Sequence, residues 1–272
     1  MNKHPSDVAL LKVDHVTVRF GGLTAVDDVS FEVHDGDLIG LIGPNGAGKT
    51  TLMRSIIGVV QPTEGSVSLA GESLNGLPIH KRIRRGMSLS QQLVKPLRDI
   101  SMSDNVALAA ASAKTVSPFR ALLNVSNDQE QAVARDKLLR VGIACMASQS
   151  PSIQPLGVLK RLELARALAL KPRVLLLDEP LAGLNSQEAH ALAATIAEIN
   201  QQGLSIVLIE HNLGEVMRIC RRLVVLDNGK KIGDGDPRSV MANPVVRAAY
   251  LGGDALGTAA VQGQPNLATN HA

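Results

Sequence analysis

A phosphate-binding loop is the clearest chemical signal in the chain. Residues 43–51 have the sequence Gly-Pro-Asn-Gly-Ala-Gly-Lys-Thr-Thr, which fills every constrained position of the template G-x-x-x-x-G-K-[ST]. In such a loop the glycines let backbone N–H groups surround phosphate oxygens, the lysine reaches the outer phosphates, and the next hydroxyl is left for Mg²⁺. The pattern predicts a nucleoside triphosphate as ligand, with Thr50 as a metal ligand. The candidate nucleotide-binding residues are Gly43, Pro44, Asn45, Gly46, Ala47, Gly48, Lys49, Thr50 and Thr51.

The residues on either side of this loop support the prediction. The apolar run at residues 38–42 predicts a buried strand that ends at the loop, and residues 50–57 predict the helix that follows it. The N-terminus of that helix would add partial positive charge to the phosphate site. The competing interpretation is a glycine-rich turn with an incidental lysine, and the strand–loop–helix context disfavours it.

Two adjacent acids end a second apolar run. Residues 173–178 predict a buried strand, which we expect beside the phosphate-loop strand, and Asp178 and Glu179 lie at its carboxyl end. An aspartate at this place can hold Mg²⁺ through water. The glutamate after it can orient and deprotonate an attacking water molecule. Asp178 is therefore a candidate metal ligand and Glu179 a candidate catalytic base, the alternative being two solvated acids at a strand end.

The elements that must position these residues alternate between helix and strand. A predicted helix at residues 156–170 precedes the strand of Asp178, and a predicted helix at residues 189–202 precedes a strand at residues 205–210. This order favours an α/β fold with a largely parallel core sheet covered on both faces. Asn228-Gly229 predicts a hairpin near the end of the sheet.

Two further units and a tail complete the predicted organisation. Alternating apolar and polar residues at 8–20 and 29–33, with residues 20–23 as the turn between them, predict an N-terminal antiparallel β subdomain. Helical patterns predict a helical subdomain inserted at about residues 93–160. We expect one domain over residues 8–252 and a disordered tail at residues 253–272, which lack apolar periodicity.

Composition narrows the class of protein. The chain has 272 residues, of which 45% are apolar, enough for a sizeable core. Its apolar stretches are too short to span a membrane and residues 1–5 lack the apolar core of a signal peptide, so we expect a cytosolic chain. A net charge of +3 and an aromatic content of 1% disfavour a nucleic acid partner.

Two minor features predict no chemistry. Cys145 and Cys220 have neither disulfide nor metal-site spacing and are expected to be buried, reduced thiols. The basic cluster at residues 80–85 is expected to be a solvated helix face, and a position near anionic lipid is its alternative.

The order of these motifs resembles that of ATP-binding-cassette (ABC) transporter ATPases, which are phosphate-loop NTPases. The resemblance covers residues 8–252 and includes the phosphate loop, Gln91-Gln92, and residues 175–180, 182–185 and 209–212. Residues 20–26, 182–185 and 243–252 are similar to the ATPase subunits of branched-chain amino-acid importers.

The resemblance implies ATP and Mg²⁺ as cofactors and a role for each matched residue. It implies that Phe20 stacks on adenine, that Gln92 reaches Mg²⁺ and senses the transmembrane subunit, and that His211 contacts the γ-phosphate. Each role suits the chemistry of the side chain, since an aromatic face stacks on a base, an amide can coordinate a metal, and an imidazole N–H can stabilise phosphoryl charge.

One motif departs from the family. The signature sequence that precedes the helix at residues 160–167 aligns with Gln154, Pro155, Leu156, Gly157 and Val158, and only Gly157 is retained. In the family this segment donates a serine hydroxyl and backbone N–H groups to the γ-phosphate held by the partner ATPase. Pro155 has neither donor, so we expect a weak half-site and a heterodimer with a second ATPase subunit whose signature is intact.

The resemblance therefore implies an ATP-hydrolysing subunit of an importer for branched-chain or related amino acids. Its expected partners are transmembrane permease subunits, a second ATPase subunit and, indirectly, a periplasmic or extracellular solute-binding protein. Its expected location is cytoplasmic, peripheral on the inner face of the cell membrane. Two alternatives remain open: a nucleotide-gated subunit that hydrolyses little ATP, and an importer of urea, amides or carboxylic acids. A cassette ATPase acting on ribosomes or DNA is disfavoured, because no tandem cassette and no basic aromatic surface is present.

Overall fold

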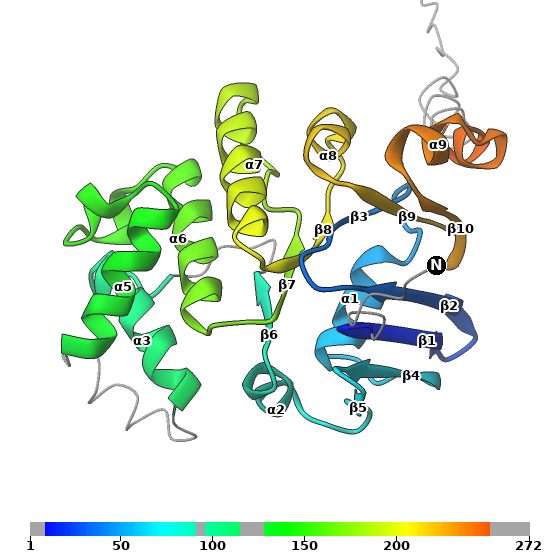
Figure 1. Cartoon of the computed structure of the whole chain (residues 1–272), viewed down its shortest axis with the longest axis horizontal. Helices are drawn as coiled ribbons and strands as arrows, with labels where there is room; N and C mark the ends of the chain where they lie inside the picture. Colours follow the sequence, from blue (N-terminus) through cyan, green and yellow to red (C-terminus); the bar gives the residue numbers. More distant parts are fainter. Residues whose placement is uncertain (1–8, 91–95, 115–127, 251–272) are drawn as a thin grey trace, which may run out of the picture.

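A six-stranded sheet lies at the centre of the computed structural model, which describes residues 9–90, 96–114 and 128–250 (Figure 1). The strand order is β10-β9-β3-β8-β7-β6. All neighbouring strands pair in parallel except β10, which forms an antiparallel hairpin with β9 through Asn228-Gly229. The prediction of a largely parallel core sheet is confirmed. The strands are β3 (Leu38–Ile42), β6 (Met87–Ser90), β7 (Val174–Asp178), β8 (Ser205–Ile209), β9 (Arg222–Asp227) and β10 (Lys230–Gly235).

Both faces of this sheet are buried, which explains why its strands are continuous apolar runs in the sequence. In β3, Leu38 and Ile42 pack into one hydrophobic cluster, while Ile39 and Leu41 pack into another on the opposite face. The first cluster is shared with helices, and the second with the N-terminal strands and with the helix at residues 49–57.

The strand order corrects one prediction. The strand of Asp178 does not lie beside the phosphate-loop strand, because β8 lies between β7 and β3. Sequence order does not fix strand order in a parallel sheet, since each crossover connection can return on either side. The three strands nevertheless run in the same direction, so their carboxyl ends meet at one edge.

A second, antiparallel sheet has the strand order β2-β1-β4-β5. Gly21 and Gly22 form the turn between its first two strands, as predicted, although β2 begins at Leu23, earlier than the expected residue 29. The strands are β1 (Leu11–Phe20), β2 (Leu23–Val33), β4 (Glu64–Leu69) and β5 (Glu72–Ser73).

The helices surround the central sheet. Figure 1 shows α3, α5 and α6 grouped at one end of the long axis, with the antiparallel sheet toward the other end. Within the described residues, every helix is too short or too polar to cross a membrane. Residues 244–250 are also helical. The helices are α1 (Lys49–Ile57), α2 (Ile79–Arg84), α3 (Met102–Lys114), α5 (Asp128–Arg140), α6 (Leu156–Ala169), α7 (Ser186–Gln201), α8 (Leu213–Ile219) and α9 (Pro237–Ala242).

The prediction of a solvated face on α2 is wrong for Arg82, whose side chain is fully buried. Its guanidinium donates hydrogen bonds to the carbonyls of Ser55 (2.9 Å) and Ile56 (2.7 Å) near the end of α1, and to that of Leu77 (3.1 Å). These carbonyls lie at helix and turn ends, where a basic side chain can satisfy them. The other basic residues of the cluster are exposed: His80, Lys81, Arg84 and Arg85.

The two thiols differ in exposure. Both cysteines are free, but Cys145 is exposed and only Cys220 is buried, so the prediction of burial is wrong for Cys145. Cys145 lies in a short 3-10 helix, Ala144–Met146, in which no residue is buried. Burial raises the pKa of the Cys220 thiol to about 12, which keeps it protonated and unreactive near neutral pH.

Candidate functional site

The phosphate loop connects β3 to α1 and depends on two glycines. Gly43 has φ 146° and Gly48 has φ 97°. A Cβ atom at Gly43 would lie 2.0 Å from the carbonyl oxygen of Leu226, and one at Gly48 would lie 2.4 Å from that of Ala25. Only glycine allows both the backbone conformation and the close approach, so the loop is shaped by its neighbours before any ligand binds.

Lys49 lies at the first position of α1 with its side chain folded over the loop. Its ammonium donates hydrogen bonds to the carbonyls of Gly43 (2.7 Å) and Pro44 (2.8 Å). Burial lowers the pKa of Lys49, while the negative charges of Glu179 and Asp178 act in the opposite direction. The residue thus presents a compact positive charge beside the loop, as an outer-phosphate ligand requires.

A cavity of about 400 Å³ opens over the loop. Phe20, at the end of β1, has a side chain that is 50% exposed, and with Leu23 it forms an apolar wall. Glu179 and His211 form part of the lining. Of the predicted site residues, the cavity brings together Phe20, Asn45, Gly46, Ala47, Gly48, Lys49, Thr50, Thr51, Glu179 and His211.

The remaining predicted residues lie elsewhere. Gly43 and Pro44 contact the cavity residue Lys49 through their carbonyls. Gly157 is absent from the lining, at the start of α6, and Gln92 lies outside the described residues.

Asp178 ends β7 and carries an unsatisfied oxygen. Its Oδ1 atom is buried without a hydrogen-bond partner in the described part of the chain. Burial and the neighbouring charge of Glu179 raise the pKa of Asp178, while the charges of Arg54, Lys49 and His211 lower it. A buried, unpaired carboxylate oxygen suits a hard divalent cation.

The donor set near Asp178 fits Mg²⁺. Within residues 9–90, 96–114 and 128–250, no three or more His, Cys, Asp or Glu side chains form a metal-binding group. Mg²⁺ does not need such a group, because it keeps several waters and binds one or two carboxylates together with substrate phosphates. Asp178 and the hydroxyl of Thr50 are donors of the kind that it prefers.

Glu179 is held from three sides. Its Oε1 atom lies 2.9 Å from Nε2 of His211, its backbone N–H donates to the carbonyl of Ile209 (3.0 Å), and its own carbonyl accepts a hydrogen bond from the ammonium of Lys160 (3.1 Å). Its φ of 51° is unusual for a glutamate and persists only when the surroundings enforce it. The Glu179 side chain is 15% exposed and that of His211 is 44% exposed, so both reach the cavity.

Glu210 lies directly after β8 and is only 3% exposed. Its Oε1 accepts a hydrogen bond from the N–H of Leu181 (2.6 Å), and its Oε2 accepts one from the N–H of His211 (3.2 Å). Burial raises the pKa of Glu210, opposed by these two backbone hydrogen bonds and by one from Asn212. Sequence reasoning did not select Glu210 or Lys160. The available signal for Glu210 was an acid between a buried strand and a predicted site histidine.

Tyr250 links the last described helical residues to the phosphate loop. Burial raises the pKa of its phenol to about 12, and a hydrogen bond with the backbone of Gly43 acts in the opposite direction. The end of the described chain therefore packs against the loop, a contact that the sequence does not reveal.

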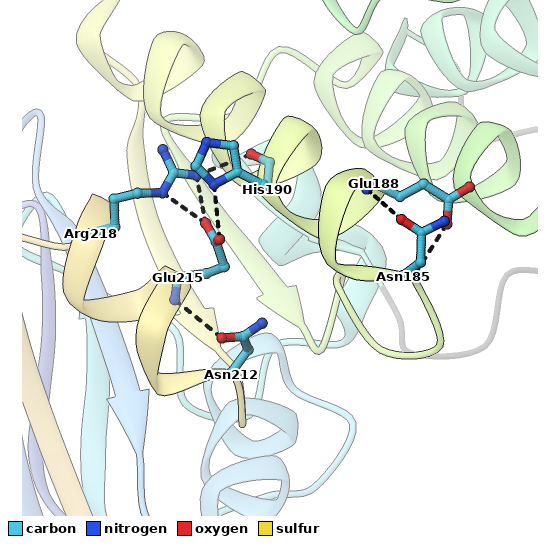
Figure 2. A network of polar contacts seen from close by, with 6 residues as sticks. All are labelled: Asn185, Glu188, His190, Asn212, Glu215 and Arg218. Atoms are coloured by element: carbon cyan, nitrogen blue, oxygen red, sulfur yellow. Dashed lines mark hydrogen bonds and ion pairs between the residues drawn. The ribbon is translucent and has the colours of Figure 1, made fainter.

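Figure 2 shows the starts of α7 and α8, which follow Glu179 and His211 in the sequence. Asn185 and Glu188 form a reciprocal capping box at the start of α7, with N–H to oxygen distances of 2.9 and 3.1 Å. Asn212 caps α8 by accepting the N–H of Glu215 at 3.2 Å. Such caps satisfy free N–H groups and fix where each helix begins. The helix that follows Glu179 therefore begins with a capped turn after Asn185, and the helix that follows His211 begins with one after Asn212.

The same figure shows a network that joins α8 to α7. Oε1 of Glu215 lies 3.0 Å from Nδ1 of His190, and Arg218 donates from Nε to Oε2 of Glu215 (2.8 Å) and from Nη2 to the carbonyl of His190 (3.0 Å). Although burial alone raises the pKa of Glu215, these partners hold it below its ordinary value.

The degenerate signature segment forms a regular helix start. Pro155 is the N-cap of α6 without a side-chain capping bond, and its carbonyl accepts the N–H groups of Val158 and Leu159. The side chain of Leu156 extends toward the loop after Glu179, where a Cβ atom at Gly183 would lie 2.9 Å from it. Proline is well tolerated at a helix start, so the fold accommodates the loss of the family sequence.

Comparisons with known proteins agree with this geometry. The ABC transporter family model matches residues 26–182, and the branched-chain amino acid ATP-binding cassette transporter model matches residues 230–255. The chain is 36% identical over 249 residues to the high-affinity branched-chain amino acid transport ATP-binding protein BraF of Pseudomonas aeruginosa. It is 37% identical over 249 residues to the corresponding protein LivG of Escherichia coli (strain K12). Each alignment covers 89% of this chain and 98% of the relative.

A solved structure shows the same fold. The ADP conformation of MJ1267, an ATP-binding cassette of an ABC transporter, superposes with a TM-score of 0.81 at 26% sequence identity, covering 90% of this chain and 99% of that one. The predicted phosphate-loop NTPase fold is confirmed. The chain therefore belongs to the ABC transporter family of ATPases and is similar to the ATP-binding proteins of branched-chain amino acid transport.

Proposed function

We propose that this chain is the ATP-hydrolysing subunit of an importer for branched-chain or related amino acids. The observation that carries the proposal is the contact of 2.9 Å between Glu179 and His211 at the edge of the phosphate-loop cavity. A carboxylate and an imidazole at this edge are suited to act on the outer phosphate of a nucleotide held by the loop, which supports the proposal. The proposed solute class rests on the similarity to BraF and LivG.

Binding is assigned to the loop and to the apolar wall. Backbone N–H groups of residues 45–51 and the ammonium of Lys49 hold the phosphates, and Phe20 stacks on the adenine ring. Thr50, Asp178 and Gln92 are the proposed ligands of Mg²⁺. When bound, that ion neutralises charge on the phosphates.

Hydrolysis is assigned to Glu179 and His211. The carboxylate of Glu179 orients a water molecule and takes its proton as the water attacks the γ-phosphate. The imidazole of His211 is nearly half exposed and can turn its N–H toward a phosphate oxygen, which stabilises the charge that develops there.

The partners follow from the incomplete signature. We propose that a second ATPase subunit with an intact signature completes the site of this chain, and that both subunits work on transmembrane permeases at the cytoplasmic face of the membrane. A solute-binding protein outside the membrane would act indirectly. The second candidate function, a nucleotide-gated subunit that hydrolyses little ATP, is favoured by one observation, the absence of a hydroxyl at Pro155.

The test of hydrolysis uses the chain assembled with its permeases and the second ATPase. Glu179→Gln should leave ATP affinity unchanged and lower kcat by about 100-fold or more, because an amide cannot take a proton from water. Lys49→Ala should abolish binding of a fluorescent ATP analogue, because it removes the positive charge beside the loop. Glu198→Gln, an exposed acid of α7, is the matched control and should behave as the parent.

The outcomes separate the two candidate functions. Parental turnover by the Glu179→Gln complex would remove Glu179 as the base and favour the gated subunit. Parental affinity of Lys49→Ala would contradict the assignment of the loop. Uptake of labelled leucine and of urea by proteoliposomes that contain the complex and its binding protein tests the solute class. Uptake of urea without uptake of leucine would contradict the proposed amino-acid class and favour urea as the solute.

A further inference from the structure

Glu210 connects two segments that the proposed mechanism needs at a fixed separation. Leu181, which donates its N–H to one carboxylate oxygen, lies two residues after Glu179. His211, which donates its N–H to the other oxygen, follows Glu210 directly. The carboxylate therefore joins the backbone that carries Glu179 to the backbone that carries His211.

The surroundings of Glu210 make this connection stiff. The side chain is 3% exposed, so water does not compete for its oxygens. The ammonium of Lys160 is also buried, donates to the carbonyl of Glu179, and attracts the negative charge of Glu210. Glu179 is held from its other side by the carbonyl of Ile209, the residue that precedes Glu210.

We propose that Glu210 is a positioning residue for hydrolysis: its carboxylate holds the two backbone segments in the register that sets Glu179 and His211 2.9 Å apart. This inference rests on the proposed function, because it assigns Glu210 a role that acts through Glu179 and His211. Glu210 does not line the cavity and is not expected to contact the nucleotide.

A carboxylate suits this place better than its neutral isostere. Both oxygens of an ionised glutamate only accept hydrogen bonds, and here each oxygen faces a backbone N–H. A glutamine would turn one NH₂ group toward one of these donors, so one connection would be lost whichever way the amide is oriented. The remaining hydrogen bond would hold the backbone at either Leu181 or His211, and the other of the two would no longer be held by this side chain.

Glu210→Gln should therefore lower kcat without changing nucleotide binding. A displacement of about 1 Å in a reacting group can reduce the rate by about 100-fold, so we expect a loss of about 10- to 100-fold in kcat. The KM for ATP should stay within about twofold of the parental value, because the phosphate loop that binds ATP is not attached to Glu210.

The experiment measures kcat, KM and thermal unfolding of the full complex with its permeases and second ATPase. Asp234→Asn is the matched control, since Asp234 is a partly buried acid paired with Arg222 and Lys231 away from the cavity. It should lower the melting temperature but leave kcat unchanged. Glu210→Asp, whose shorter side chain cannot span both donors, is measured in parallel and keeps the question testable if the amide variant does not assemble.

A double variant tests whether Glu210 acts through Glu179. In the Glu179→Gln background, Glu210→Gln should reduce the residual rate far less than in the parent, because the base whose place it fixes is already lost. Equal losses in both backgrounds, parental kcat in both Glu210 variants, or a raised KM with parental kcat would overturn the inference. If Glu179→Gln itself retains parental kcat, the proposed function fails instead, so the two failures are distinguishable.

Discussion

At the level of single residues, the site contains four ionisable side chains close to the carboxyl edge of the central sheet. Lys49, Lys160 and Glu210 are buried, and Asp178 carries a buried oxygen. Burial lowers the pKa of each lysine and raises the pKa of each acid. Opposite charges nearby reduce the effect for Lys49, Lys160 and Asp178, whereas backbone hydrogen bonds reduce it for Glu210. Asp178 has a buried oxygen without a partner among the described residues, and we propose that a bound nucleotide with Mg²⁺ would supply that partner.

Asp178→Asn should stabilise the nucleotide-free chain at neutral pH. The folded-state pKa of Asp178 is raised above its ordinary value of 3.8. The protonated carboxyl group therefore makes its full contribution to the free energy of unfolding below pH 3.8, and this contribution is lost as the pH rises through the folded-state pKa. The variant removes this loss, and its advantage in melting temperature should grow as the pH rises from about 3.8 through the folded-state pKa. Differential scanning fluorimetry over a series of pH values that ends at neutral pH measures it.

The control for this prediction has the opposite sign. Burial raises the pKa of Asp234, but hydrogen bonds from Arg222 and Lys231 outweigh burial and hold this pKa below its ordinary value. Asp234→Asn should therefore destabilise the chain most at pH 7.5 and less as the pH falls.

Adding MgATP should raise the melting temperature of the parent more than that of Asp178→Asn. A lower melting temperature of nucleotide-free Asp178→Asn at neutral pH would contradict the conclusion that burial of Asp178 destabilises its charged form.

The residues of this site differed in how far the sequence could reveal them. The phosphate loop and the acids at 178–179 could be predicted because each motif consists of consecutive residues of characteristic types. The contacts of Glu210 and Lys160 could not be predicted, because each residue acts on backbone groups of a distant segment, and backbone donors and acceptors have no sequence signature. For Glu210 the sequence offered only its place between a buried strand and a predicted site histidine. The role of Phe20 came only from family resemblance, although its exposed position beside the cavity agrees with it.

At the level of helices and strands, the helix α2 holds α1, the helix that follows the phosphate loop. Arg82 of α2 donates to the carbonyls of Ser55 and Ile56 near the end of α1, so the short helix α2 fixes the end of α1 opposite to the loop. Its Nη2 atom has no hydrogen-bond partner among the described residues, which reduces the net gain. Gly58 leaves room for the guanidinium, since a Cβ atom there would lie 2.6 Å from Nε of Arg82.

Arg82→Ala should lower the free energy of unfolding by about 3 kcal/mol, because it leaves buried carbonyls unsatisfied and opens a cavity. Urea unfolding of the isolated chain measures this. Arg84→Ala, an exposed arginine of the same helix, is the matched control and should change the free energy of unfolding by less than about 0.5 kcal/mol. Equal effects of the two substitutions would show that the buried contacts contribute little.

Helices and strands of the core could be predicted from the sequence, whereas their neighbours in space could not. The alternation of buried strands and amphipathic helices indicates a parallel sheet, but the insertion of β8 between β3 and β7 depends on how the crossovers pack. The burial of Arg82 escaped prediction for a related reason. A helix of 6 residues is too short to show a periodic apolar face, so composition alone suggested solvent exposure.

At the level of the whole molecule, the nucleotide cavity and the signature segment are separate. The cavity is lined by the phosphate loop, Phe20, Glu179 and His211, whereas the signature segment at the start of α6 contributes no residue to it. The family resemblance implies that such a segment faces the nucleotide of a second subunit. The missing donors at Pro155 would then impair the partner's site and leave the site of this chain dependent on the partner.

The isolated chain should therefore hydrolyse ATP slowly, even at concentrations that favour self-association, and a partner with an intact signature should restore activity. The combined substitutions Pro155→Ser, Leu156→Gly and Val158→Gln should raise the rate of the isolated chain by about tenfold or more, since they return a hydroxyl and an accessible backbone N–H. Serine is also a favourable N-cap, so α6 should remain intact. Steady-state phosphate release, measured for each chain alone and with partner, tests both statements.

The control for the restored signature is Ile153→Ser, which adds a hydroxyl nearby at a side chain that is 80% exposed but lies before the helix start. It should not change the rate, because its hydroxyl is not at the N-cap of α6. Rapid hydrolysis by the parental chain alone would mean that the donors missing at Pro155 are not required. An equal gain from Ile153→Ser and from the combined substitutions would mean that any added hydroxyl near the helix start raises the rate, without a donor directed at a phosphate.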